Sequence, residues 1–107
     1  MDDRQPTVLY VDDNPKSRRL LASVLQNCGF KVITAADSVE ALSQFRDTSV
    51  DLALVDYQMP QLSGAELAGN MKGINPDVPV VMISGCAVPA FELCFVDAHF
   101  GPGTAFD

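Results

Sequence analysis

The chain has 107 residues, of which 48% are hydrophobic and 20% are charged. This length indicates one domain, and the composition excludes an intrinsically disordered protein. The formal net charge of −7 argues against a surface that binds nucleic acid or an anionic membrane. No signal peptide or membrane-spanning run is present, and three cysteines without close pairing (Cys28, Cys86 and Cys94) indicate reduced thiols. We therefore expect a cytoplasmic protein.

The N-terminal half predicts two strand–helix pairs. Residues 8–11 are continuously apolar, as in a strand buried on both faces. A helix is predicted over 15–28, with Pro15 in its first turn and Gly29 after its end. Its apolar face holds Leu20, Leu21, Val24, Leu25 and Cys28. A second strand follows at 31–34. The next helix, over 38–47, is expected to have Ser38 as its cap and Ala41, Leu42 and Phe45 inward.

The C-terminal half continues the alternation. Residues 52–55 and 80–83 are again continuously apolar and predict buried strands. Between them, a helix over 63–73 would turn Leu67 and Met71 inward, although its three glycines weaken it. A short helix is expected at 89–96, and a last strand at 98–100. Strict alternation of strands and helices predicts an α/β fold with a parallel sheet and right-handed crossovers.

Polar side chains follow three of the predicted strands. Asp12 and Asp13 follow the first, Asp56 the third and Ser84 the fourth. Because parallel strands end at the same edge of a sheet, these groups should converge where α/β proteins bind ligands. Clustered carboxylates repel unless a cation neutralises them, and oxygen ligands suit Mg²⁺. A metal beside a nucleophilic carboxylate is an arrangement that can accept a phosphoryl group.

Each element also has a structural explanation. The segment 12–15 alone reads as a helix N-cap, Asp56 and Met59-Pro60 as an ordinary loop and turn, and Ser84-Gly85 as a loop. The combination, in this order and spacing, favours a functional site.

These residues resemble the receiver domain of two-component response regulators. The resemblance covers about residues 7–86 and includes the segments 8–15, 51–56, 59–60 and 79–85, together with Gly64. It implies a flavodoxin-like (CheY-like) doubly wound parallel sheet of five strands in the order 2-1-3-4-5. We expect residues 1–107 to form one such domain, abbreviated at its C-terminus.

The resemblance also implies roles for individual residues. Asp56 looks like the phosphoacceptor, with Asp12 and Asp13 as the acid pocket and Asp13 as the more direct Mg²⁺ ligand. Gln58 would offer its backbone carbonyl to the metal, and Ser84 looks like the switch hydroxyl that contacts the phosphoryl group. A histidine kinase or phosphotransfer protein is the implied partner.

The sequence departs from the family after the fourth strand. The family carries a Lys at the end of the fifth strand, usually followed by Pro. Here that position falls on Gly101 or, shifted by one, on Pro102, in which case His99 takes the place of the aromatic switch residue. Neither register supplies a Lys, and no Lys or Arg follows Lys72. A lost charge-assisted hydrogen bond of about 1.5–3 kcal/mol would weaken phosphoryl stabilisation or switching.

Two helices are also affected. Residues 103–107 are too few for the family's packed fifth helix, so one sheet face is expected to lack its cover and to pair with a second copy or a partner. The fourth helix should be abbreviated, because the stretch between Ser84 and Pro102 is short. Its apolar residues fit either a core-facing helix or an interaction face: Phe91, Leu93, Cys94, Phe95 and Val96. Cys86 could edge the site, and Lys16 could reach the acid pocket, although each also fits an ordinary structural position.

Three functions fit this pattern. The first is a receiver that takes a phosphoryl group from a histidine kinase onto Asp56 with Mg²⁺. The second is a degenerate receiver, which serves as a docking or oligomerisation module independent of phosphorylation. The third is a small Mg²⁺-dependent phosphatase, which is disfavoured because Gln58 stands where such enzymes carry a second Asp.

Overall fold

The computed structural model describes residues 5–59 and 62–101. Five parallel strands form one sheet in the order β2-β1-β3-β4-β5, which confirms the order that the family resemblance implied. The strands are β1 (Thr7–Val11), β2 (Lys31–Ala35), β3 (Leu52–Asp56), β4 (Val80–Ile83) and β5 (Ala98–Phe100). All of β1 is buried, because it pairs with β2 on one side and β3 on the other. Within these described ranges, no helix is long and apolar enough to cross a membrane.

The main core lies between the sheet and two helices, α2 (Ser38–Asp47) and α3 (Gly64–Ile74). Successive strand residues face opposite sides, and Leu9, Val11, Ala53, Val55, Val80 and Met82 form the sheet's share of this core. Phe45 of α2 and Leu67 and Met71 of α3 pack against them, which confirms the predicted inward positions. The expected Ser38 cap is wrong: Asp37 is the cap, because its extended backbone lets its carboxylate accept the Glu40 N–H at 2.8 Å.

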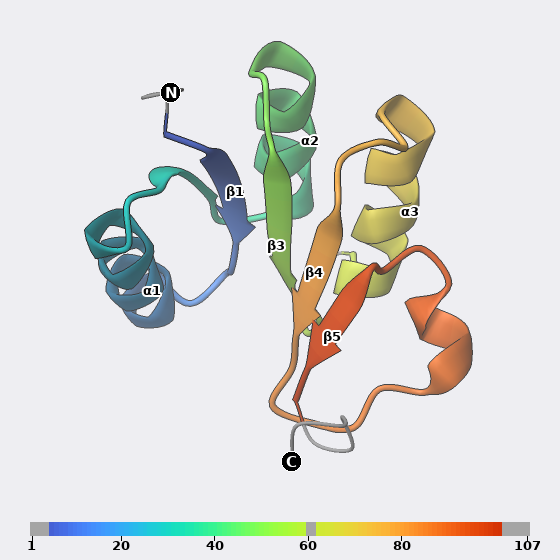
Figure 1. Cartoon of the computed structure of the whole chain (residues 1–107). Coiled ribbons are helices and arrows are strands. Elements are labelled where there is room, and N and C mark those ends of the chain that lie inside the picture. The colour runs from blue at the N-terminus through green and yellow to red at the C-terminus, as the bar shows by residue number, and fades with distance from the viewer. Residues whose placement is uncertain (1–4, 60–61, 102–107) are drawn as a thin grey trace.

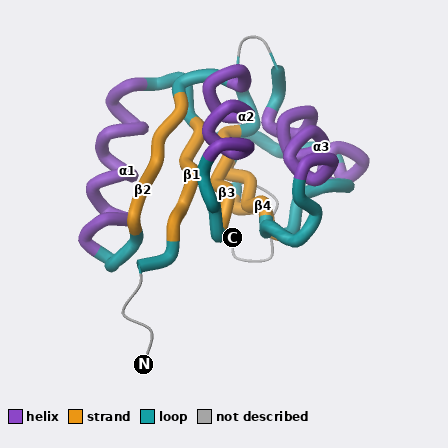
Figure 2. Tube along the Cα trace, turned by 90° about the horizontal axis from the view of Figure 1, so that it is seen from above, coloured by secondary structure: helices purple, strands orange, loops and turns teal. Residues whose placement is uncertain are grey.

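The other sheet face carries only α1 (Pro15–Asn27) among the described helices (Figures 1 and 2). Asn14 caps α1 by accepting the N–H groups of Lys16 and Ser17, and Gly29 ends it with a φ of 100°. No residue of α1 is buried, and its apolar side chains Leu20 and Val24 are 69% and 46% exposed. Leu21 and Leu25 of the same helix are half-buried, so α1 turns only part of its apolar surface toward the sheet.

On the same side of the sheet as α1, part of the surface of β3, β4 and β5 is not covered by that helix; we call this part the open sheet face. Its members are half-buried or exposed apolar side chains of β3, β4 and β5: Leu52, Leu54, Val81, Ile83 and Phe100. Phe100 is 44% exposed. Parallel sheets are normally covered on both faces. The expectation of an uncovered face is therefore confirmed for the described residues, whereas residues 103–107, where the family's last helix would begin, lie outside them.

The predicted helix at 89–96 is wrong in length and type. Only one 3₁₀ turn, η1 (Ala90–Leu93), forms after β4. Pro89 precedes this turn without a side-chain cap. A helix that continued to residue 96 would not fit, because Asp97 already lies against β4. The Asp97 N–H donates to the Val80 carbonyl oxygen, and the Asp97 carboxylate accepts the Val80 N–H. The expected abbreviation of this region is confirmed.

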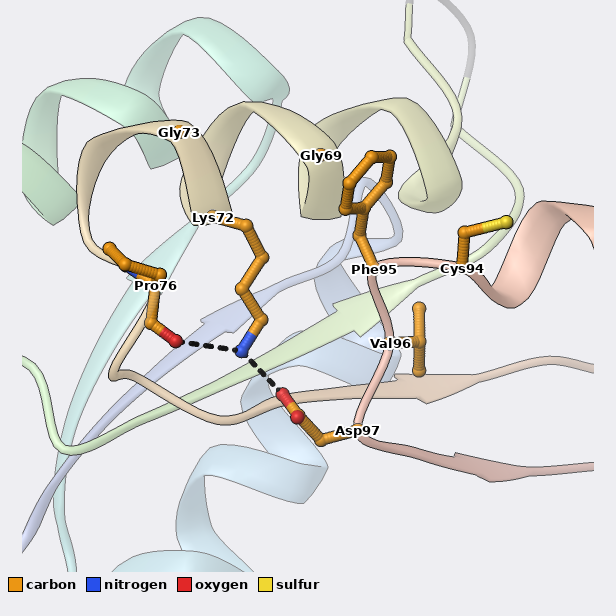
Figure 3. A pocket seen from close by; sticks show the side chains of 8 residues that line it. All are labelled: Gly69, Lys72, Gly73, Pro76, Cys94, Phe95, Val96 and Asp97. Carbon is orange, nitrogen blue, oxygen red and sulfur yellow. Dashed lines mark hydrogen bonds and ion pairs between the residues drawn. The ribbon is translucent and has the colours of Figure 1, made fainter.

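Lys72 anchors this shortened region to α3. Its ammonium group donates to the carbonyl oxygen of Val78 at 2.8 Å and to the Asp97 carboxylate at 2.6 Å, and more weakly to Pro76 (Figure 3). Nearby, the Phe95 ring lies against Gly69, where a Cβ would be 3.2 Å from it. Lys72, the last basic residue before His99, thus ties α3 to the segments that lead into β4 and β5.

Candidate functional site

Three carboxylates meet at the carboxyl edge of the sheet. Asp56 ends β3, while Asp12 and Asp13 directly follow β1. The register pairs Val11 with Val55, so Asp12 and Asp56 leave adjacent strands at the same level. One carboxylate oxygen from each of the three acids lies within 4.8 Å of the others. The predicted convergence of these three residues is therefore present in the structure.

The three acids differ in their environment. Asp12 is buried with 5% exposure, Asp56 is half-buried and Asp13 is exposed. Burial raises the pKa of Asp56 to about 6, and the charges of Asp12 and Asp13 act in the same direction. Backbone hydrogen bonds from Gln58 and Tyr57 partly oppose this shift. The cluster is therefore short of positive charge, which is the condition that a bound cation relieves.

Backbone packing under Asp56 depends on one glycine. α3 begins at Gly64, and its N–H donates to the Tyr57 carbonyl oxygen at 2.9 Å. A Cβ at Gly64 would lie 2.5 Å from the Asp56 carbonyl oxygen and 2.9 Å from the Tyr57 Cα. Only glycine allows α3 to start this close, so Gly64 helps to fix where the β3 end presents Asp56.

The donor set suits a magnesium ion. It consists of carboxylate oxygens, with no sulfur or imidazole among the clustered groups, and Mg²⁺ prefers oxygen ligands while keeping several waters. Gln58, the predicted carbonyl ligand, lies beside these acids: with Asp13, Tyr57, Met59 and Ser63 it lines a cavity of about 440 Å³. Of the three acids, Asp13 lines this cavity, so the cavity lies at the edge of the acidic cluster.

Ser84 follows β4, as expected, but its hydroxyl is turned into its own loop. The Oγ donates to the Cys86 carbonyl oxygen at 2.5 Å and accepts the Cys86 N–H at 3.0 Å. The Cys86 sulfur lies 3.6 Å from the same oxygen, so Cys86 does edge this part of the site. In this arrangement the hydroxyl proton is already used by the loop.

Among the residues that the structure describes, the end of β5 offers no Lys or Arg side chain to the acids. A Cβ at Gly101 would lie 2.5 Å from the Ser84 carbonyl oxygen, so this position has no room for a side chain as the backbone stands. Pro102, the other candidate for the family's Lys position, lies outside the described residues.

His99 is separated from the acids by the sheet. It is level with Met82 of β4, whereas Phe100 is level with Ile83 and hence with Asp56. Since side chains alternate along strands, His99 and Asp56 occupy opposite faces. The Nε2 atom of His99 is buried without a hydrogen-bond partner among the described residues.

Two tyrosines at the site had no role in the sequence interpretation. Tyr10 is 1% exposed and its hydroxyl donates to the Asp12 carboxylate at 2.5 Å. Tyr57 directly follows Asp56, and its hydroxyl donates to the carboxylate of Glu92 in η1. This bond raises the pKa of Tyr57. For Tyr10 a signal existed, because residues i and i+2 of a strand share a face; Glu92 depended on a loop path that no local pattern predicts.

The fold and site define a class of protein, a doubly wound α/β domain with an acidic cluster at the carboxyl edge of its sheet, and comparison with known proteins agrees with it. The family model described as "Response regulator receiver domain" matches residues 8–98. The chain therefore belongs to the response regulator receiver domain family.

Among curated relatives, the autoinducer 1 sensor kinase/phosphatase LuxN of Vibrio campbellii is 34% identical over 85 residues, covering 79% of this chain and 10% of that protein. The sensor histidine kinase RcsC of Salmonella typhimurium is 36% identical over 81 residues, covering 76% of this chain and 8% of that protein. The chain thus spans about a tenth or less of the length of these two relatives.

Solved structures show the same fold. The response regulator TrrA of Thermotoga maritima, in complex with Mg²⁺–BeF, superposes with a TM-score of 0.87 at 30% identity, covering 96% of this chain and 91% of that one. The structure of TrrA with the histidine kinase ThkA gives a TM-score of 0.84 at 28% identity, covering 96% of this chain and 89% of that one.

Proposed function

We propose that this chain is a phosphoacceptor receiver domain, which takes a phosphoryl group from a histidine kinase or phosphotransfer protein onto Asp56. The observation that carries the proposal is the meeting of three carboxylates at the carboxyl edge of the sheet in a chain of the receiver family. The TrrA complexes with Mg²⁺–BeF and with a histidine kinase support both the metal and the partner.

In this proposal, Asp12, Asp13, Asp56 and the Gln58 carbonyl group hold Mg²⁺. The bound ion offsets negative charge on the phosphoryl oxygens. One Asp56 oxygen forms a bond to phosphorus as the bond from phosphorus to the donor histidine nitrogen breaks, and the electron pair stays on that nitrogen. The product is an acyl phosphate. The chain acts as a signalling domain that at most phosphorylates and dephosphorylates itself.

Ser84 would take part after transfer. Its hydroxyl would leave the Cys86 carbonyl oxygen and donate to a phosphoryl oxygen instead, a charge-assisted bond that is stronger than the neutral one it replaces. Because the acceptor it leaves belongs to the loop before η1, this exchange would release that loop. His99 is retained as a candidate switch residue on the opposite sheet face.

A second function is favoured by the end of β5. Gly101 leaves no space for a side chain beside Ser84, and no Lys or Arg follows Lys72, so the cation that other receivers place there is missing. A degenerate receiver that docks or oligomerises without phosphorylation would need neither the cation nor the acyl phosphate.

Intact mass after treatment with acetyl phosphate and Mg²⁺ separates the two functions. We expect one phosphoryl adduct on the wild-type chain and none on Asp56→Asn, because the amide is not a nucleophile. Asp77→Asn, which changes an exposed acid away from the site, is the matched control and should keep the adduct. Absence of the adduct from a folded, Mg²⁺-binding wild-type chain would favour the docking module.

The remaining proposals concern the setting of the domain. Residues 1–107 act as one receiver unit in the cytoplasm. The open sheet face pairs with a second copy of the chain, whereas nucleic acid and membranes are not partners. The net charge of −7 supports the last point, and the exposure of Phe100 supports the pairing.

A further inference from the structure

Tyr10 is placed directly behind the acids by the geometry of β1. It precedes Asp12 by two residues, so both side chains leave the same face of the strand. It is also level with Leu54, which precedes Asp56 by two residues on the neighbouring strand. The Tyr10 side chain is 1% exposed, and its hydroxyl donates to Asp12 Oδ2 at 2.5 Å.

Asp12 is held at every polar atom. Its Oδ1 accepts the Asn14 N–H at 2.9 Å while Oδ2 accepts the Tyr10 hydroxyl. Its backbone N–H donates to the Ala35 carbonyl oxygen, and its own carbonyl oxygen accepts the Arg18 guanidinium at 2.8 Å. Each carboxylate oxygen keeps a further lone pair, and the two fixed bonds decide where those lone pairs point.

We propose that Tyr10 is a positioning residue for the magnesium site, which it serves by holding the Asp12 carboxylate in the orientation that the metal or its bound water requires. This inference rests on the proposed function, because it concerns how the same site is prepared. Asp13 is exposed and can adjust to the ion, whereas Asp12 is pre-oriented. Partners that orient a metal's ligands typically contribute ten- to a hundred-fold to affinity.

The first test is Mg²⁺ affinity measured by calorimetry on Tyr10→Phe, which removes only the hydroxyl. We expect binding about ten-fold weaker than in the wild-type chain. Thr7→Val is the matched control: it also removes a single hydroxyl group from a buried residue of β1, at the end of the strand that lies away from the acids. Its Mg²⁺ affinity should remain within about two-fold of the wild-type value, because the hydroxyl that it removes does not touch the acids.

The second test measures the fluorescence of Tyr10 itself, and it does not require the Tyr10→Phe variant to fold. The chain has two tyrosines and no tryptophan. In the Tyr57→Phe variant, Tyr10 is therefore the only source of tyrosine fluorescence. We expect Mg²⁺ to change this emission with the midpoint found by calorimetry, since the ion draws charge from the carboxylate that accepts the hydrogen bond of the phenol. A tyrosine with a purely packing role would keep its emission.

The outcomes separate this inference from the proposed function. Unchanged Mg²⁺ affinity in folded Tyr10→Phe, or unchanged Tyr10 emission while Mg²⁺ binds Tyr57→Phe, would overturn the role of Tyr10 and leave the phosphoacceptor intact. Failure of the wild-type chain to bind Mg²⁺ would overturn the metal site and this inference together. Phosphorylation of Asp56 is read independently by mass.

Discussion

Asp56 is an acid whose ionisation opposes folding. Its pKa rises from 3.8 to about 6 in the folded chain, first because of burial and then because Asp12 is nearby. Between these pH values the folded state binds more protons than the unfolded state, so the free energy of unfolding falls as pH rises through this window. Near neutral pH the site is therefore charged at the expense of stability, as is common where function needs clustered charge.

Asp56→Asn should consequently stabilise the chain near neutral pH in the absence of Mg²⁺. We expect a gain of roughly 1–2 kcal/mol in the free energy of unfolding, after allowing for partial solvent screening. The gain should vanish below pH about 4, where both states of the wild-type chain are protonated. Urea unfolding in chelator-containing buffer measures it, and exposed Asp77→Asn is the control. A variant less stable than wild type at neutral pH would contradict this account.

At the level of single residues, the sequence located the three acids but missed the tyrosine that bonds Asp12. Asp12, Asp13 and Asp56 were predictable because each stands where an apolar run stops, and parallel strands stop at one edge. Tyr10 was assigned to the apolar run itself, since its ring fits a buried strand and its hydroxyl adds no pattern. The inward turn of the Ser84 hydroxyl depends on a loop conformation that residue types do not specify.

Among the helices, α3 carries glycines whose surroundings differ. A Cβ at Gly73 would meet nothing within 4 Å, whereas at Gly69 it would lie 3.2 Å from the Phe95 ring. Gly73→Ala should stabilise the chain by about 0.5–1 kcal/mol, because alanine is the better helix former. Gly69→Ala should gain less, since Phe95 must shift. Thermal unfolding of both variants checks this, and equal gains would show that Phe95 does not press on α3.

The anchor of the 3₁₀ region gives a second prediction for the elements. Lys72→Met removes the bonds to Val78 and Asp97 and keeps the length of the side chain. We expect a loss of roughly 1–3 kcal/mol in the free energy of unfolding, because a partly buried carbonyl group and a carboxylate lose their donor. The exposed Lys31→Met should change stability by no more than about 0.5 kcal/mol. Similar melting temperatures for the two variants would count against the anchor.

Element order was predictable, and element ends were less so. The apolar runs at 8–11, 52–55 and 80–83 became strands, because continuous apolar residues fit a sheet buried on both faces. The N-cap of α2 is Asp37 and not the predicted Ser38, because the backbone of Asp37 is extended. The helix expected at 89–96 is only the short turn η1. Both errors arise where tertiary contacts decide a boundary, in the latter case the contacts of Asp97 with Lys72 and Val80.

For the molecule as a whole, the two sheet faces are unequal. The face under α2 and α3 holds the main core, while the open sheet face lies beside α1 alone among the described helices (Figure 2). Half-exposed apolar side chains on a parallel sheet favour association. In the proposed pairing, the open sheet face of one copy lies against the same face of another, as a two-fold interface requires.

Phe100→Glu should therefore reduce self-association. Sedimentation at high protein concentration should show dimers of the wild-type chain and monomers of this variant, since a carboxylate cannot be buried unpaired in an apolar interface. Val39→Glu is the matched control, because Val39 is 72% exposed on α2, across the sheet. A wild-type chain that sediments as a monomer at every concentration would refute the pairing.

The shortness of β5 has a consequence for local opening of the chain. This edge strand has three residues, and it pairs with a strand, β4, on one side only. The Ser84 N–H donates to the Phe100 carbonyl oxygen at 3.0 Å, so the amide of Ser84 is released to solvent whenever β5 frays. Amide hydrogen exchange should thus be faster at Ser84 than in the central strand β1. The loop that carries the Ser84 hydroxyl would then open whenever β5 frays, without global unfolding of the chain.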